Sequence, residues 1–542
     1  MARKKKSETQ TSKQSGSRSS SAKPESGNLF ERVFGCDYRS LAAFRIAMGI
    51  VLIWDLVFRF PTLVEMYTDQ GFFTRELAYD YQHFRAGEGW HESVWSFHWM
   101  SGSPEFQTVL FVLAGIAGLM LTFGYWTRIA TIVSWAFLVS LHNRNPVIIS
   151  SGDFLLKMML FWSIFVPLGR VWSVDAWLRT RKKVESSLPA VGNYVSVATA
   201  ALVVQLFLMY FFSGVAKWNE DWWGGDAMYY VLHLDIFVND FGKQMLEYPL
   251  MLKFITLGTL LAEVFLIWTL FSPKFNGRFR MLNLIVFWGF HIGIGLSMSI
   301  GLFPIICMAC WLPLLPSWIW DFFSKRETAE SDQPSPDVSN RTPVYIATQV
   351  FCAVTLAYVV LWNVINVESL GLREKFARDF FRPGLILNLE QHFQMFGRPP
   401  RTNPWFVYEA TLTDGRMVDL YSGKPLTEEH IKTESAREAM PNFHWRRLHR
   451  NLVGQREELR QPMGEYFVRH WNETHGEDEQ VRRFKLLCYL TETGPDFNEL
   501  SNHSSVWSKW PLVEEEAAGS LFDAQLQRLE DGEEIEIGGL GF

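Results

Sequence analysis

Long apolar runs dominate this sequence and decide what it can fold into. A helix needs roughly 20 mainly apolar residues to cross a bilayer, and about nine stretches approach that length. They predict an all-α polytopic membrane bundle of about nine transmembrane helices in residues 36–365. The third stretch is short, and the eighth is interrupted by three prolines. The candidate spans are residues 41–60, 107–126, 128–142, 154–172, 195–216, 249–271, 281–299, 302–320 and 344–365.

The composition agrees with a lipid-embedded chain. Of the 542 residues, 48% are hydrophobic and 15% aromatic, and the small net charge of -6 argues against a nucleic-acid partner. The five cysteines are too scattered to predict a disulfide framework. Cys307 and Cys310 have the spacing of a redox or metal pair, but they lie in an apolar run without a second pair and are expected to be buried thiols. No metal or phosphate motif occurs.

The charges of the connections predict a topology. Lys and Arg gather in alternate connections, whereas residues 61–106 and 217–248 contain more Asp and Glu. Because cationic loops stay on the cytoplasmic side, we expect the N-terminus inside and the C-terminal part outside. Residues 1–35 are predicted to be a disordered basic tail. The plasma (inner) membrane of a bacterium is the expected location, in preference to the endoplasmic reticulum.

Residues 366–513 lose the long apolar runs and predict a small extramembrane α+β domain. Alternating segments on both sides of Thr413-Asp-Gly-Arg416 indicate a hairpin. Residues 442–452 and 465–475 are expected to be helical, and residues 483–491 to form a strand. Residues 514–542 are acidic, which is typical of an amphipathic helix followed by a loose tail, or of a tail that binds a partner.

Lys217 is the foremost candidate for chemistry. The apolar run Val195–Ala216 leads into this single lysine, and no further cation follows until Lys243. Desolvation disfavours the ammonium form, so a lysine at membrane depth can serve as a neutral amine base. The alternative is a lysine that snorkels, with its head among the lipid phosphates.

Other ionisable residues inside the predicted spans mark functional sites or internal ion pairs. Glu263 is a plausible partner for Arg45, since each deep charge needs one. Arg45, Asp55 and Glu263 are therefore interpreted either as structural ion pairs or as groups that contact substrate. His291 is either a satisfied core histidine or part of the site. These deep residues are Arg45, Asp55, Lys157, Glu263 and His291.

Several motifs resemble the vitamin K-dependent gamma-carboxylase family, the HTTM (horizontally transferred transmembrane) proteins. The resemblance covers about residues 35–425. The segment around Lys217 is similar to the family's catalytic segment, and further matches follow in the family's order along the chain. The matching residues are Gly214, Val215, Lys217, Asp221, Trp222, Gly225 and Met228, with Ser40–Arg45, Trp172–Asp175, Phe290-His291 and Ser299–Phe303.

The resemblance implies an enzyme that oxidises reduced vitamin K, or a related quinol, with O2 to an epoxide. The strong base so formed removes a proton from glutamate, and the carbanion takes up CO2. Lys217 is then the base that deprotonates the quinol, Trp222 and Trp223 wall its flat ring, and Asp221 orients the amine or caps a helix. A Glu-containing peptide is the expected partner from the outer side.

Two alternatives remain open. Animal carboxylases have an Asn-His pair before the fourth span, whereas residues 145–153 contain no histidine. The second hypothesis is therefore a quinone-epoxidising or other lipid-linked oxidoreductase without carboxylation. The third is a non-catalytic membrane scaffold or a transporter.

Overall fold

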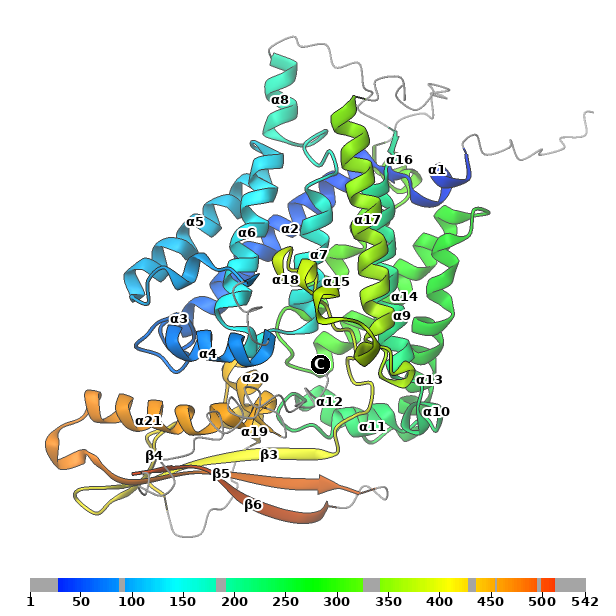
Figure 1. Cartoon of the computed structure of the whole chain (residues 1–542). Helices are drawn as coiled ribbons and strands as arrows, with labels where there is room; N and C mark the ends of the chain where they lie inside the picture. The colour runs from blue at the N-terminus through cyan, green and yellow to red at the C-terminus, as the bar shows by residue number, and fades with distance from the viewer. Residues whose placement is uncertain are drawn as a thin grey trace, which may run out of the picture.

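The computed structural model describes residues 28–86, 93–181, 192–324, 342–426, 435–453, 456–494 and 499–511. The basic tail predicted before residue 28 and the acidic tail predicted for residues 514–542 lie outside the described residues. Most described residues are helical, and a small β-sheet lies at the lower end of the helical bundle (Figure 1).

Six helical segments among the described residues are long and apolar enough to cross a membrane, and a broken seventh is bent by 90°. Pro313 and Pro316 lie at its break, where a proline cannot donate the next helical hydrogen bond. The six are Tyr38–Tyr67, Pro104–Phe123, Val197–Ala216, Pro249–Phe271, Asn276–Ser297 and Pro343–Ile365, and the bent pair is Phe303–Leu314 with Ser317–Phe323.

The prediction of nine spans is not confirmed. Helices do form in the two remaining stretches, as α6 (Thr127–Arg144) and α7 (Ser151–Ser163), but α7 has only 13 residues. The last turn of α6 carries His142, Asn143 and Arg144, which lower its hydropathy. All residues of α7 are buried, so it is a central strut of the bundle.

The remaining bounds follow the chain. The long helices are α2 (Tyr38–Arg59), α5 (Pro104–Phe123), α9 (Val197–Ala216), α13 (Pro249–Val264), α14 (Asn276–Ser297), α15 (Phe303–Cys310) and α17 (Pro343–Ile365). The shorter ones are α1 (Leu29–Phe34), α3 (Leu63–Tyr67), α4 (Arg75–Ala86), α8 (Val174–Arg181), α10 (Glu220–Trp223), α11 (Ala227–Leu232), α12 (Asp240–Met245), α16 (Ser317–Ser324), α18 (Arg382–Ile386), α19 (Ala436–Ala439), α20 (Phe443–Leu452) and α21 (Arg460–Thr474).

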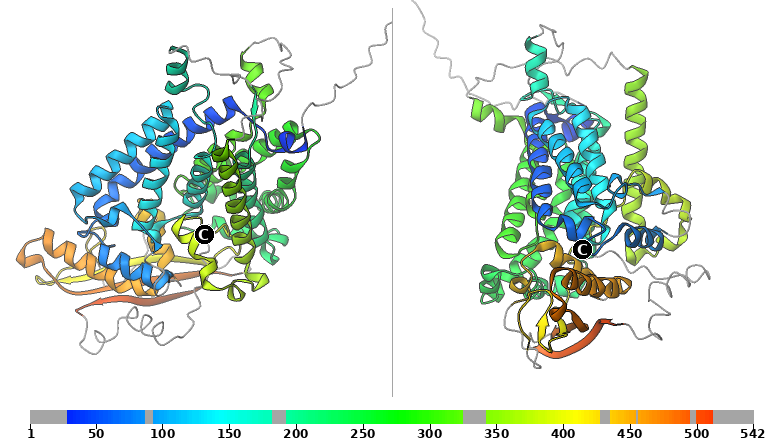
Figure 2. Two further views of the ribbon diagram at one scale, coloured as in Figure 1. Left: turned by 45° about the horizontal axis from the view of Figure 1, so that its top comes forward. Right: turned by 90° about the vertical axis from the view of Figure 1, so that its left-hand side faces the viewer.

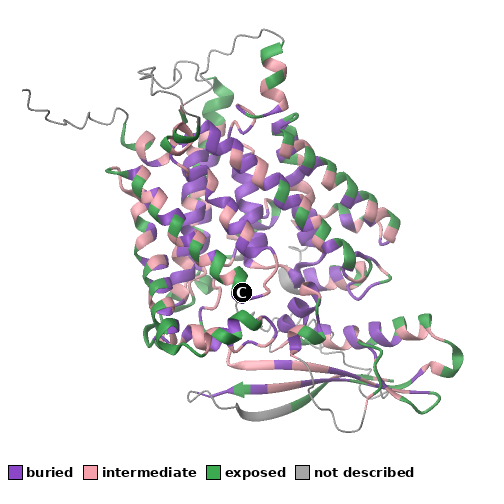
Figure 3. Ribbon diagram, turned by 180° about the vertical axis from the view of Figure 1, so that it is seen from behind, coloured by how far each residue is buried: buried purple, intermediate pink, exposed green. Residues whose placement is uncertain are grey.

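Burial separates the inner helices from the outer ones. Purple buried residues fill the middle of the bundle, and exposed residues follow its outer helices (Figure 3). The outward residues of α5 and α17 include Val109, Ile116, Val350 and Val354, all exposed and apolar. Exposed apolar surface on this scale suits a protein that faces lipid.

The connections separate to two ends of the bundle as their charges predicted. The cationic helix α8 and the elements α1 and α16 lie at the upper end, and α10, α11, α12 and the sheet lie at the lower end (Figure 1). The acidic connection 217–248 thus shares its end with the C-terminal part. Which compartment each end faces stays a prediction.

The C-terminal sheet is antiparallel with strand order β4-β3-β5-β6. Its strands are β3 (Thr402–Leu412), β4 (Met417–Asp419), β5 (Val481–Thr493) and β6 (Glu499–Trp510). The predicted hairpin is confirmed, with Thr411 opposite Met417 and Gly415 in the left-handed region at φ 89°. The predicted helices and strand correspond to α20, α21 and β5. Helix α21 lies between the bundle and the sheet (Figure 2).

Helix α20 fixes this C-terminal part to the bundle. Arg447 donates to the carbonyl of Ile149, and Asn451 donates to that of Val147. Because both acceptors lie in the connection between α6 and α7, the docking brings α20 beside the first turn of α7.

Candidate functional site

Lys217 ends α9 as its C-cap residue and turns its side chain into the protein. It is 3% exposed, which contradicts the snorkelling alternative. Its Nζ lies 2.8 Å from a carboxylate oxygen of Glu263 on α13 and donates to the hydroxyl of Ser213. Ser213 is four residues earlier, on the same face of the helix. Its hydroxyl in turn donates to Glu263, which makes a closed group of three buried side chains.

The close approach of α9 and α13 depends on Gly214. A Cβ atom at this position would lie 2.8 Å from Val264 Cγ2 and 3.0 Å from Glu263 Cβ. These separations are too short for any other residue without a shift of one helix. Gly214 therefore sets the helix spacing that brings the Glu263 carboxylate to Lys217.

Lys217 and Glu263 line a cavity of about 810 Å³, counted with its open mouth. Most of the lining is apolar and comes from α14, α15 and the segments around them. A second part comes from the C-terminal residues Met395, Phe396, Phe443 and Arg447. An apolar cavity with a few convergent polar groups is the ordinary form of a small-molecule site. The apolar and aromatic lining includes Trp222, Met228, Val231, Phe237, Phe290, Ile294, Met298, Ile300 and Phe303.

Trp222 forms one side of this cavity. It is 2% exposed, and the Lys217 Nζ lies 5.2 Å from the centroid of its ring. Its indole Nε1 donates to the carbonyl of Phe396, which fixes the ring against the C-terminal segment. A flat aromatic wall beside an amine suits a planar ligand.

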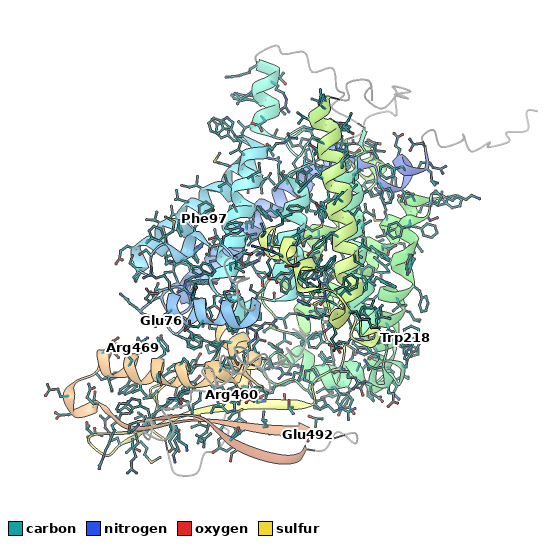
Figure 4. All side chains as sticks on the ribbon, viewed as in Figure 1. Glu76, Phe97, Trp218, Arg460, Arg469 and Glu492 are labelled. Atoms are coloured by element: carbon teal, nitrogen blue, oxygen red, sulfur yellow. The ribbon has the colours of Figure 1, made fainter. Side chains whose placement is uncertain are left out.

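Asp221 and Trp223 lie outside the cavity. Asp221 pairs with Arg401 at 2.8 Å, and Asn219, not Asp221, precedes α10 as its N-cap. Trp223 is 41% exposed and packs edge-on against Trp218, whose side chain lies at the outer side of the bundle (Figure 4). The two expected roles of Asp221, orienting the amine and capping the helix, do not match these contacts.

His291 is buried behind the cavity and is not among its lining residues. Its Nε2 lies 2.7 Å from the Tyr210 hydroxyl, which accepts a hydrogen bond from Trp311 Nε1. Since Tyr210 then has its own proton to donate, His291 Nε2 acts as the acceptor. His291 thus contacts the cavity only through its neighbours Phe290 and Ile294, which line it.

Arg45 and Asp55 also lie away from the cavity, and the expected pair of Arg45 with Glu263 is wrong. Arg45 donates to the carbonyls of Leu121 and Thr122 at the C-terminal end of α5 and to that of Trp172. A cation there complements the helix dipole. Asp55 pairs at 2.8 Å with Arg59, one turn further along α2.

Lys157 and Asp175 have structural contacts as well. The Lys157 amine donates to the side chain of Asn388. Asp175, the last residue of the Trp172–Asp175 motif, accepts from the backbone N–H groups of Trp126 and Thr127. It therefore caps the start of α6.

A second, more polar pocket of about 1570 Å³ lies on the other side of Phe396. Phe396 lines both pockets and has a φ of 51°, in the left-handed region. Asn219 connects the Lys217 turn with this segment by donating to the carbonyl of Gly397. The polar lining includes Asn363, Asn366, Gln391, His392 and Arg398.

The sequence matches the model of the HTTM domain over residues 35–320, more than half of the chain. The chain belongs to the HTTM family. HTTM domains are associated with vitamin K-dependent carboxylase-like membrane proteins. No solved structure matches this HTTM protein. Its described residues contain no group of three or more His, Cys, Asp or Glu side chains suited to a metal ion.

Three contributors to the HTTM cavity were missed by sequence reasoning. Ser213 had a usable signal, because it lies four residues before Lys217. Ser151 and Arg447 gave none, since a serine flanked by apolar residues and a basic helix far along the chain are common in proteins without such a cavity. Arg447 reaches the cavity only because α20 docks on the bundle.

Proposed function

We propose that this HTTM protein is a membrane-embedded enzyme that oxidises a reduced quinone with O2, using Lys217 and Glu263 to accept the quinol proton. The observation that carries the proposal is the buried pair of these two residues in an apolar cavity. Reduced vitamin K or a related quinol is the proposed substrate. In the full reaction, the quinol and one O2 give the epoxide and water.

The pair suits proton abstraction because it can change its protonation without a large change in charge. As an ion pair, the ammonium of Lys217 and the carboxylate of Glu263 have no net charge. A quinol hydroxyl can give one proton to the pair, either to the carboxylate directly or to the amine after Lys217 has passed its own proton to Glu263. Both routes end with an ammonium, a carboxylic acid and a quinolate, and the ammonium stabilises the quinolate.

The residues around the pair suit the quinol. The Trp222 ring provides a flat surface 5.2 Å from the amine, and Phe290 and Phe303 add aromatic walls. A dry cavity strengthens the electrostatic interaction between the ammonium and the quinolate. A quinol with an isoprenoid tail can reach this site through lipid.

We propose that the oxidation is coupled to carboxylation of glutamate in a peptide that arrives from the outer side. The second candidate is quinol oxidation without carboxylation. The absence of histidine from residues 145–153 favours this second candidate.

The test is an assay of purified full-length protein in nanodiscs with reduced vitamin K, O2 and labelled CO2, in which epoxide and fixed carbon are measured separately. We expect epoxide from the wild-type protein, none from Lys217→Ala, and partial recovery when small amines are added to that variant. Lys253→Ala is the matched control, because Lys253 lies on α13 with a half-exposed side chain that pairs with Asp226. Epoxide at the wild-type rate from Lys217→Ala would rule out the proposed base. Fixed carbon distinguishes the two candidates, and a wild-type protein inactive on several quinols favours a scaffold or a transporter.

A further inference from the structure

One wall of the Lys217 cavity is polar and has no part in quinol deprotonation. It consists of Ser150, Ser151 and Arg447, and we call it the polar wall. Ser151 is 2% exposed, and its Oγ has no hydrogen-bond partner among the residues that the structure describes. A buried hydroxyl without a partner is costly, so an unsatisfied one that lines a cavity indicates a polar ligand.

The polar wall is also positive. Arg447 is 8% exposed, and its Nε and one terminal nitrogen donate to the Ile149 carbonyl, which fixes the guanidinium at the cavity. Ser151 is the first residue of α7, whose 13 residues place the positive end of a helix dipole at the same wall.

The nearest acidic side chain of this turn is engaged elsewhere. Asp153 does not line the cavity. It caps the first turn of α7 through Ser150 and pairs with Arg59 at 2.6 Å, with His142 at 3.4 Å. The lining of the cavity therefore has one carboxylate, Glu263, and this carboxylate is already paired with Lys217.

We propose that the polar wall binds the carboxylate of a second substrate in the same cavity as Lys217. A guanidinium, a hydroxyl and the first turn of a helix favour an anionic group with two oxygens. Between the polar wall and Lys217, the apolar lining leaves space for a quinol ring. A cavity of about 810 Å³ is large for one ring, since pockets of about 300–1,000 Å³ hold drug-sized ligands.

This inference uses the proposed function only for the identity of the first substrate, and it can be tested without any quinol. The probe is propionate, with the neutral isostere propionamide as the control ligand. Binding to full-length protein in nanodiscs is measured by saturation-transfer NMR. We expect propionate to bind and propionamide not to compete.

The variants assign the site. Arg447→Gln is expected to weaken propionate binding by about tenfold or more, Arg447→Lys by less, and Ser151→Ala by about threefold, from the usual strength of charge-assisted hydrogen bonds. Arg450→Gln is the matched control, because Arg450 is a buried arginine on the same helix that does not line the cavity. Ser151→Ala removes only an unpartnered hydroxyl, so it tests the proposal even where Arg447→Gln fails to fold.

Lys217→Ala separates this proposal from the proposed function. It is expected to abolish epoxide formation and to retain propionate binding. If the Lys217 variant loses propionate while the Arg447 and Ser151 variants retain it, the lysine is the anion site and the inference is overturned. Absence of propionate binding to the wild-type protein overturns it as well, whatever the epoxide assay gives.

Discussion

The carboxylate of Glu263 lies 2.8 Å from the amine of Lys217, and both side chains are almost completely buried. Two charges in such a place stabilise each other, so each residue is needed for the other to stay charged. A lysine that only extended to the lipid surface could be removed at little cost in stability. The observed pair changes that expectation.

Removal of one partner should therefore destabilise the protein more than removal of both. Lys217→Met is expected to lose about 3–5 kcal/mol in the free energy of unfolding, because Glu263 is left buried and alone. The double variant Lys217→Met with Glu263→Leu should regain most of this loss and remain inactive. Thermal unfolding of the purified protein measures both, and additive losses in the two single variants and the double variant would contradict the pairing.

Gly214→Ala should separate the pair without removing either residue. The added Cβ meets Val264 and Glu263 at 2.8 and 3.0 Å, and overpacking of this kind costs about 1–3 kcal/mol. We expect a lower melting temperature and a lower rate of epoxide formation. Gly258→Ala on α13 is the control, since a Cβ there has no neighbour within 4 Å, and it should gain about 0.5–1 kcal/mol from helix propensity. Equal effects of the two substitutions would contradict the role of Gly214.

The Arg59 cluster provides a prediction about stability alone. Arg59 contacts both Asp55 and Asp153 in the buried core, so Arg59→Leu leaves two buried carboxylates and should cost about 3–5 kcal/mol. Arg75→Gln is the comparison, because the Arg75–Asp69 pair is roughly 40% exposed and should contribute less than about 1 kcal/mol. Chemical denaturation of the two variants, followed by tryptophan fluorescence, measures the contrast.

His449 predicts a pH dependence of the extramembrane part. Burial lowers the pKa of His449 from 6.5 to about 4, while its Nδ1 donates to the Trp445 carbonyl and its Nε2 contacts the Tyr408 hydroxyl. The unfolded chain binds a proton near pH 6.5 and the folded chain only near pH 4. Stability should therefore fall by about 1.4 kcal/mol per pH unit as the pH drops through this range, and not below it.

Hydrogen exchange of α20 in the full-length protein, corrected for intrinsic rates, measures this loss. His449→Gln should reduce the slope. An unchanged slope in that variant would assign the effect to another group, of which His444 is the nearest candidate, since burial lowers its pKa to about 3.

The topology can be tested with two single cysteines, because all five native thiols are buried. Thr180→Cys on α8 and Ser422→Cys after β4 lie at opposite ends of the molecule, and both positions are at least partly exposed. We expect an impermeant maleimide to label Ser422→Cys in intact cells and Thr180→Cys only after permeabilisation. The reverse pattern would invert the predicted orientation.

Sequence reasoning located the deep charges but not their partners. Hydropathy shows how far along a helix Glu263 lies, whereas its partner depends on which faces of α9 and α13 meet, and Gly214 decides that. Arg45 binds backbone carbonyls, which have no sequence signature. Strand alternation and the Asp-Gly turn predicted the β3–β4 hairpin, but β6 was missed because its serine-rich sequence lacks a clear alternation of apolar residues.

The C-terminal walls of the cavity have a consequence for how such chains are compared. The family match ends at residue 320, yet Met395, Phe396, Phe443 and Arg447 close the space around Lys217. The reacting amine is therefore shielded from water by a part of the chain that the shared domain does not include. Two proteins can have the same lysine and the same membrane helices and still differ in what they admit, because selectivity is set by the appended part while the reactive pair is inherited.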